Sequence, residues 1–201
     1  MFNVESSLQR VWKARDRSLN VSTGRDYTDD HLVANAKAGS HAAFEIIIDH
    51  YAEQVYRLAL RMLNNPDDAR DIQQETFIRV MQQIHRFRGE AALSTWIYAI
   101  TAKLCLSSHR HRQRHPCDVL EENFAADSGD PLQHVMQQEE REIIQRVLCQ
   151  LAPADRLLII LKHIEGHDHK TIARILGCSE ESSRSRLNRA RKLFRALYQQ
   201  E

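Results

Sequence analysis

Residues 65–101 read NPDDARDIQQETFIRVMQQIHRFRGEAALSTWIYAIT, and this stretch predicts two helices joined by a short connection. Asn65 can cap the first helix because its side-chain oxygen can accept a hydrogen bond from an early backbone N–H, and Pro66 suits the first turn. Gly89 can end that helix, and Ser94 or Thr95 can cap the second one. We therefore expect a helical hairpin here.

The first of these helices has an apolar face and a polar face. At 100° per residue, the apolar side gathers Ala69, Ile72, Phe77, Val80, Ile84 and Phe87. The opposite side carries Asp67, Asp71, Gln74, Glu75, Ile78 and Gln82. An ordinary helix with one solvated face fits most of this pattern. Ile78 interrupts the polar face, however, and an apolar residue there suits a docking surface better than bare solvent.

The composition of the whole chain bounds its class. Of 201 residues, 42% are apolar, only six are Gly and four are Pro, and no strand-like alternation is sustained. This favours an all-α fold with enough apolar material for two small cores. The net charge is only +1, so nucleic-acid binding requires local basic patches.

Cysteine spacing and hydropathy indicate the compartment. The four cysteines are scattered without a CxxC pair, which fits a reducing cytosol. No apolar run is long enough for a signal-peptide core or a membrane span. We therefore expect a cytoplasmic protein without membrane insertion.

The helical patterns divide the chain into four predicted segments. Residues 1–29 form an N-terminal extension and residues 30–114 a compact helical domain, which includes a helix stripe from Phe44 to Met62 with Ile48 inward. Residues 115–131 contain five acids and no Lys or Arg, which predicts a flexible acidic linker. Residues 132–201 form the second helical domain.

The second domain contains a helix-turn-helix pattern. Asp168 can cap a short helix that ends at Leu176, Gly177 makes the turn, and Ser179 can cap a last helix from 180 to 198. Its outward side chains are mostly polar or basic and include Glu181, Ser182, Arg184, Ser185, Arg186, Arg189 and Lys192. In a recognition helix, side chains near the N-terminus reach base edges while flanking cations hold phosphates. This pattern predicts DNA binding.

A basic run, SSHRHRQR at 107–114, ends the first domain. It fits a solvated helix end whose cations offset the helix dipole. It fits equally well a phosphate-contacting edge beside Trp96 and Tyr98, in which Arg110 and Arg112 make the contacts.

Two histidine-rich groups are candidate metal sites. One contains His109, His111, His115 and Cys117, and the other contains His163, His167 and His169. Imidazole and thiolate can bind zinc or copper, but neither group has the spacing of a structural zinc site. The chain shows no nucleophile–base pair, paired catalytic carboxylates or phosphate loop. We therefore predict no metal, no cofactor and no enzymatic activity.

Two regions of the chain resemble bacterial sigma factors of the compact extracytoplasmic-function group. The second conserved region of that family is similar to D-x-x-Q-E-x-F at 71–77, FRG at 87–89, and STWIY at 94–98 with Ile100. The fourth region is similar to LAP at 151–153 with Arg156, Gly166, IA at 172–173, LGC at 176–178, SSRSRL at 182–187 and RAR at 189–191. Ala152, Thr171 and Glu181 depart from the usual Pro, Glu and Gly. These departures put in doubt which promoter is read.

The resemblance implies a sigma factor that joins core RNA polymerase, directs it to promoter DNA and helps open the duplex. The implied contacts with a coiled coil of the largest polymerase subunit are Asp71, Gln74, Glu75, Ile78 and Gln82. Those with the minus-ten element are Arg88, Ser94, Thr95, Trp96 and Tyr98, with Arg110 and Arg112 beside them. The last helix is expected to read the minus-thirty-five element.

The resemblance further implies that an anti-sigma factor holds the chain inactive by covering the same surfaces. Two alternatives rest on the residues alone. One is a stand-alone helix-turn-helix regulator with no polymerase contact. The other is a metal-dependent enzyme or metal sensor that uses the histidines.

Overall fold

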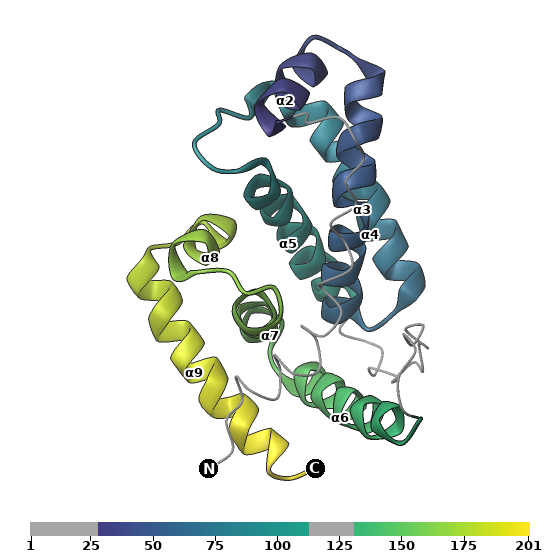
Figure 1. The fold of residues 1–201 in the computed structure, drawn as a ribbon. Coiled ribbons are helices and arrows are strands. Elements are labelled where there is room, and N and C mark those ends of the chain that lie inside the picture. The colour runs from purple at the N-terminus through teal and green to yellow at the C-terminus, as the bar shows by residue number, and fades with distance from the viewer. Residues whose placement is uncertain (1–27, 113–130) are drawn as a thin grey trace.

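The computed structural model describes residues 28–112 and 131–201, with only the backbone described at 109–112 and 131–138. Every regular element within these residues is helical, as predicted (Figure 1). The predicted N-terminal extension and acidic linker lie almost entirely outside the described residues. Within the described ranges, no helix is long and apolar enough to cross a membrane.

The first half consists of α2 (Asp29–Lys37), α3 (His41–Leu63), α4 (Pro66–Gln83), the 3-10 turn η1 (Ile84–Arg86) and α5 (Leu93–Arg112). The predicted cap at Asn65 forms, and Ser40 caps α3 in the same way. Ser40 Oγ accepts a hydrogen bond from the Ala43 backbone N–H at 3.3 Å, and Asn65 Oδ1 accepts from two backbone N–H groups at 3.0 and 3.1 Å. Local capping chemistry therefore fixes the starts of α3 and α4.

The start of α5 differs from the prediction. The helix begins at Leu93, and the Trp96 backbone N–H donates to the Ala92 carbonyl at 3.2 Å, so neither Ser94 nor Thr95 occupies the capping position. Leu93 is almost fully buried. Burial of this side chain in the core places the first turn earlier than the polar caps indicate.

The predicted apolar stripe of α3 is correct except at Ile48. Ile47, Tyr51, Val55 and Leu58 are buried, but Ile48 is 39% exposed. Neighbouring helix residues lie 100° apart, so with Ile47 at the centre of the buried face, Ile48 turns outward. The prediction that Ile48 belongs to the core was wrong.

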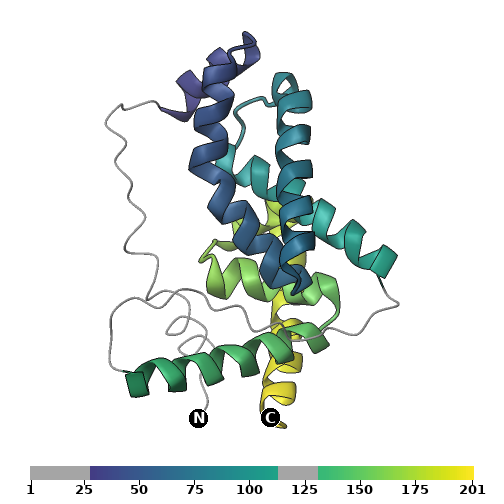
Figure 2. The same cartoon turned by 90° about the vertical axis from the view of Figure 1, so that its right-hand side faces the viewer.

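The second half consists of α6 (Pro131–Gln150), α7 (Pro153–Ile159), the π-helical turn η2 (Ile160–Ile164), α8 (His169–Leu176) and α9 (Glu180–Tyr198). In the π turn, the Glu165 backbone N–H donates to the Ile160 carbonyl at 2.9 Å. Gly166 follows with φ of +75°, which ends the helix. Figure 2 shows α6 crossing beneath the ends of α3 and α4.

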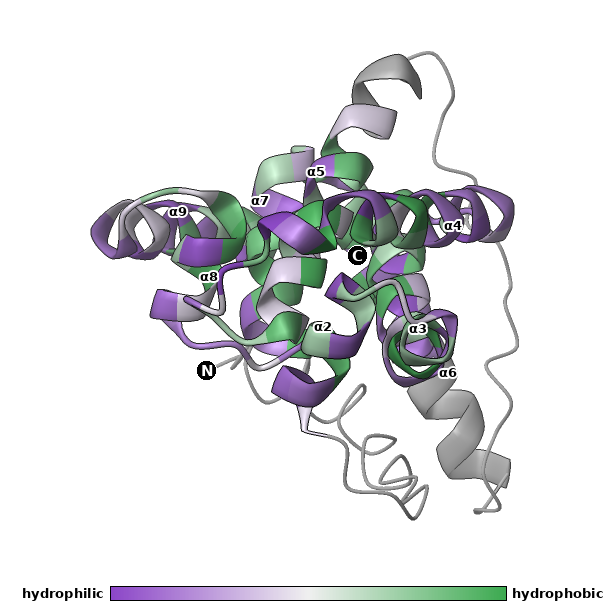
Figure 3. Ribbon diagram, turned by 90° about the horizontal axis from the view of Figure 1, so that it is seen from above, coloured by the Kyte–Doolittle hydropathy of each residue, from purple (hydrophilic) through white to green (hydrophobic). Residues whose placement is uncertain are grey.

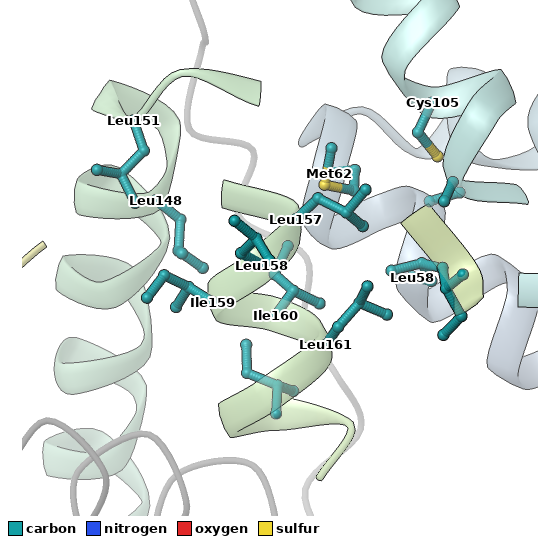
Figure 4. Packing of buried hydrophobic residues seen from close by; sticks show 14 of the residues in the cluster. Leu58, Met62, Cys105, Leu148, Leu151, Leu157, Leu158, Ile159, Ile160 and Leu161 are labelled. Carbon is teal, nitrogen blue, oxygen red and sulfur yellow. The ribbon is translucent and has the colours of Figure 1, made fainter. Parts of the chain in front are cut away.

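The buried residues form two clusters, but these do not coincide with the two predicted domains. The smaller cluster lies within the first half, where α2 packs on α3 and η1 and the cluster also takes in residues of α4 and α5. The larger cluster combines the ends of α3, α4 and α5 with α6 to α9. Figure 4 shows Leu157 and Leu161 of the second half directed toward Leu58 and Met62 of α3. The two halves therefore share one hydrophobic core.

Candidate functional site

The polar face of α4 is exposed, as its pattern predicts. Asp71, Gln74 and Gln82 are exposed, and Glu75 is half-buried with its Oε1 2.7 Å from Arg79 Nε. Figure 3 shows this outer side of α4 as mostly hydrophilic. The structure therefore brings the five predicted docking residues together on one uncovered helix face.

Apolar side chains interrupt this face. Ile78 is 44% exposed and Met81 is 49% exposed, one turn apart on α4. The surface formed by Ile78 and Met81 is hereafter called the α4 patch. An apolar patch within a polar face is typical of a protein-binding surface.

The loop between α4 and α5 rests on a fixed base. Phe87 is buried, its ring lies 5.3 Å from that of Trp96, and its carbonyl accepts a hydrogen bond from Lys37 Nζ at 2.7 Å. Gly89 has φ of +74°, and exposed Arg88 lies 3.8 Å from Glu90 across this turn. The loop therefore leaves the core at a defined point and presents Arg88 to solvent.

The predicted minus-ten residues differ in accessibility. Ser94 and Trp96 are half-buried, whereas Thr95 is buried at the base of the loop. Arg110 and Arg112 lie in the last turn of α5, and their side chains are outside the described residues. Arg88, Ser94 and Trp96 thus form the accessible part of this predicted site.

Tyr98 is buried between the two halves. Its hydroxyl donates to Glu165 Oε2 at 2.8 Å, and its ring meets that of His167 edge-on with centroids 5.0 Å apart. Burial raises the pKa of Tyr98 well above its ordinary value, and the nearby Glu165 carboxylate raises it further. In this arrangement Tyr98 cannot contact DNA, which the sequence pattern alone did not indicate.

The helix-turn-helix has the predicted boundaries and caps. Asp168 Oδ1 accepts from the Thr171 backbone N–H at 2.7 Å, and this hydrogen bond lowers the pKa of the Asp168 carboxyl. Gly177 adopts φ of +64°, and the Cys178 backbone N–H returns to the Ala173 carbonyl at 3.0 Å. Ser179 Oγ accepts from the Ser182 backbone N–H at 3.2 Å and starts α9. Local hydrogen bonds thus fix the orientation of α9 relative to α8.

The outward side of α9 is accessible. Ser183, Leu187, Ala190 and Phe194 are buried against the core, while the predicted contacts Glu181, Arg184, Ser185, Arg186, Arg189 and Lys192 are exposed and Ser182 is half-buried. Arg184 Nη2 lies 2.7 Å from Glu180 Oε1, which holds its guanidinium over the first turn. Base-reading side chains lie in this part of a recognition helix.

Two histidines of the second predicted group, His163 and His167, have other contacts. His163 is buried, and its Nε2 accepts a hydrogen bond from Arg191 Nε at 3.0 Å. His167 packs on Tyr98. No group of three metal-ligating side chains comes together in the described part of the chain. The first histidine group lies outside the described side chains, and the absence of a metal stays a prediction.

Arg156 is an important residue whose role sequence reasoning did not identify. It is only 1% exposed, and its guanidinium donates to the carbonyls of Leu148 at 2.7 Å, Met62 at 2.5 Å and Cys149 at 2.6 Å. It therefore joins the ends of α3 and α6 to α7. The sequence did contain a signal for this role, because an arginine directly before the apolar run Leu157–Leu161 is expected to be buried with that run and to need hydrogen-bond partners.

Comparison with protein families gives two matches in the expected order. Residues 47–115 match the family model described as Sigma-70 region 2, and residues 141–194 match Sigma-70, region 4. The first match contains the α4 face and the loop before α5. The second contains the helix-turn-helix.

Two curated relatives are similar over most of their length. The ECF RNA polymerase sigma-E factor of Escherichia coli K12 is 32% identical over 177 residues, covering 82% of this chain and 91% of that protein. The RNA polymerase sigma-H factor of Pseudomonas aeruginosa is 28% identical over 174 residues, covering 82% and 90%.

Two solved structures share the fold. CnrH, solved in complex with the cytosolic domain of CnrY, has a TM-score of 0.64 at 20% identity and covers 86% of this chain and 98% of its own. The sigma factor RpoE, solved with the anti-sigma factor NepR from Bartonella quintana, has a TM-score of 0.58 at 23% identity and covers 78% and 96%. From its paired region 2 and region 4 and its similarity to these relatives, the chain belongs to the sigma-70 family, in the extracytoplasmic-function group of RNA polymerase sigma factors.

Proposed function

We propose that this protein binds core RNA polymerase in the cytoplasm, directs it to promoter DNA and helps open the duplex, with no catalytic reaction of its own. The observation that carries the proposal is the exposed α4 face, which combines Asp71, Gln74 and Glu75 with the uncovered α4 patch. A stand-alone DNA-binding regulator would not need such a surface. The matches to both region 2 and region 4 also favour a sigma factor over that alternative.

The α4 face is the proposed polymerase-docking surface. Asp71, Gln74, Glu75, Ile78 and Gln82 combine acidic and amide groups with an apolar side chain. Acidic groups steer a basic partner and set the orientation of docking, while the apolar centre gains affinity by burial. A coiled coil of the polymerase's largest subunit is the proposed partner.

The loop before α5 is proposed to capture bases of the minus-ten element, with exposed Arg88 and half-buried Ser94 and Trp96 as the first contacts. Opening DNA costs about 1.4 kcal/mol per base-pair step. Stacking one base on an aromatic side chain returns only about 1–3 kcal/mol. A bubble of several steps therefore needs binding energy from the polymerase as well as from this loop.

The outward side of α9 is proposed to read the minus-thirty-five element in the major groove. Arg184 and Ser185 lie in the first turns and are suited to base edges, whereas Lys192 lies two turns farther along, where the phosphate backbone would pass.

An anti-sigma factor is a further proposed partner. The solved complex of RpoE with the anti-sigma factor NepR supports this for a chain of the same fold. The α4 patch and the outward side of α9 are the surfaces such a partner could cover. A pull-down from uninduced cells should recover a protein other than polymerase subunits, and recovery of polymerase subunits alone would argue against this partner.

A charge reversal with a matched control tests the docking surface. Glu75→Lys should weaken binding to purified core polymerase by about tenfold or more, or about 1.4 kcal/mol. Glu53→Lys is the control, because Glu53 is also an i,i+4 ion-pair partner, 3.6 Å from Arg57 on α3, and lies outside the proposed surface. Both variants should keep their helix content. Wild-type affinity of the Glu75→Lys protein would contradict the docking assignment.

A further inference from the structure

One carboxylate of the second half holds two helices of the first. Glu165 lies between η2 and α8, where its Oε1 accepts a hydrogen bond from Arg61 Nη1 on α3 and its Oε2 accepts from the Tyr98 hydroxyl on α5 at 2.8 Å. The side chains of Arg61 and Glu165 are only 8% and 14% exposed. The ion pair is therefore shielded from solvent and screened little by salt.

Other polar contacts cross the same boundary. The Arg61 carbonyl accepts from Gln145 Nε2 of α6 at 3.3 Å, and the Met62 carbonyl accepts from Arg156 Nη1 of α7. These two carbonyls belong to the last turn of α3, where no intrahelical donor is available. Side chains of the second half thus satisfy the end of a helix in the first half.

Apolar packing surrounds these contacts. Leu58 and Met62 of α3 and Cys105 of α5 meet Leu157 of α7 and Leu161 of η2 in the shared core (Figure 4). Separation of the halves would expose these side chains to water and remove the partners of Arg61 and Tyr98. A paired buried charge is well tolerated, whereas one that has lost its partner is strongly unfavourable.

We propose that Arg61, Glu165 and Tyr98 form an intramolecular lock that keeps the free protein in a closed form. In this form region 2 and region 4 pack on each other, and Tyr98 is not accessible to any ligand. The lock lies within this one chain and needs no partner. Glu165 is its centre because each of its two carboxylate oxygens accepts a hydrogen bond from a different helix of the first half.

The functional consequence rests on the proposed function. Elements at minus ten and minus thirty-five lie about 25 base pairs apart, or about 85 Å at roughly 3.4 Å per base pair. In the closed form α5 packs directly on the α8 end of the helix-turn-helix, with Tyr98 and His167 in ring contact. The closed form cannot span the two elements. Release of the lock is therefore a required step before one molecule reads both.

Small-angle X-ray scattering on the full-length protein tests the lock without polymerase or DNA, so its result does not depend on the proposed function. Glu165→Gln keeps the side-chain shape and removes the charge. Tyr98→Phe keeps the ring and removes only the hydroxyl donor. Glu53→Gln is the control, since it makes the same chemical change in an ion pair with Arg57 whose carboxylate side chain is 60% exposed.

The expected result is a graded opening. Two bodies of about 85 and about 70 residues have radii of gyration of about 12 and about 11 Å, so moving their centres from contact to about 45 Å apart raises the overall radius by roughly half. We expect that rise for Glu165→Gln, a smaller rise for Tyr98→Phe, and none for Glu53→Gln, with circular dichroism showing native helix content in all three. An unchanged radius for Glu165→Gln with intact helices would overturn the proposal. If loss of helix accompanies the change in Glu165→Gln, the result for Tyr98→Phe decides, and an unchanged radius there would also overturn it.

Discussion

Arg156→Met should destabilise the protein strongly although it replaces a charge by an apolar side chain of similar length. The guanidinium is almost fully buried and donates to three carbonyls, those of Met62 in α3 and of Leu148 and Cys149 in α6. The Leu148 carbonyl also accepts a hydrogen bond from the Leu151 backbone N–H at 3.2 Å. Methionine fills the space but supplies no donor.

The magnitude follows from this geometry. Each hydrogen bond from a charged donor contributes about 1.5–3 kcal/mol, which gives about 4.5–9 kcal/mol for the three bonds that are lost. Removing the guanidinium also relieves the cost of its own desolvation, several kcal/mol in real proteins. We expect a net loss of about 3 kcal/mol in the free energy of unfolding, out of a typical total of about 5–15 kcal/mol. Arg156→Lys should be at least as harmful, because the ammonium stays desolvated and cannot match the planar fork.

Urea denaturation followed by far-ultraviolet circular dichroism measures this change. Arg70→Met is the control, since Arg70 and its ion-pair partner Asp67, 2.7 Å away, are both exposed, and it should shift stability by about 0.5 kcal/mol or less. If Arg156→Met and Arg70→Met unfold at the same midpoint with the same slope, the three hydrogen bonds contribute no net stability and the reasoning fails.

In holoenzyme, Arg184→Ala should reduce the difference in binding affinity among mutated minus-thirty-five sites by about 1–3 kcal/mol at one base position. Lys192→Ala should instead lower the affinity for all sites alike and reduce the slope of log affinity against log salt concentration by about 0.9. An equal loss on every site would make Arg184 a phosphate contact instead. Desolvation lowers the pKa of His167, outweighing Glu165 and Asp168, which raise it. The neutral imidazole therefore favours the closed form, so the radius of gyration should rise as pH falls from about 6.5 toward the lowered pKa of His167. His167→Gln should remove this pH dependence. An identical pH response in the variant would show that His167 is not its cause. Because the α4 face is exposed in the closed form, Glu165→Gln should associate with core polymerase at the wild-type rate, and stopped-flow measurements showing a clearly faster rate would contradict this.

Local structure could be predicted from the sequence because its causes are local. The caps at Ser40, Asn65, Asp168 and Ser179 depend on side chains within three residues of the backbone groups they bind. The helix-turn-helix and the exposed α4 face depend on the same short-range chemistry and on helical periodicity. Where tertiary packing competes with a cap, as at Leu93, the sequence pattern misplaces the start of the helix by two or three residues.

Contacts between the two halves could not be predicted in this way. Arg61 and Glu165 are 104 residues apart in the chain, and helical periodicity carries no information about which distant side chain a buried charge will meet. A signal was present in Arg61 itself, which stands between Leu60 and Met62 and therefore requires a partner once α3 is buried. The same contact explains why Tyr98, grouped by its motif with accessible residues, is buried here.

The closed arrangement divides the proposed surfaces into those available before opening and those available only after it. The α4 patch and the outward side of α9 are exposed in the closed form, whereas Tyr98 is not. A ligand shifts a conformational equilibrium only by its difference in affinity for the two forms. Polymerase contacts confined to the α4 face bind both forms equally and cannot open the protein. Contacts that exist only in the open form, with both promoter elements or with the newly exposed apolar surface, must supply the difference, about 5.5 kcal/mol for a shift from 1:99 to 99:1. Docking on the polymerase and release of the lock are therefore separable steps, in that order.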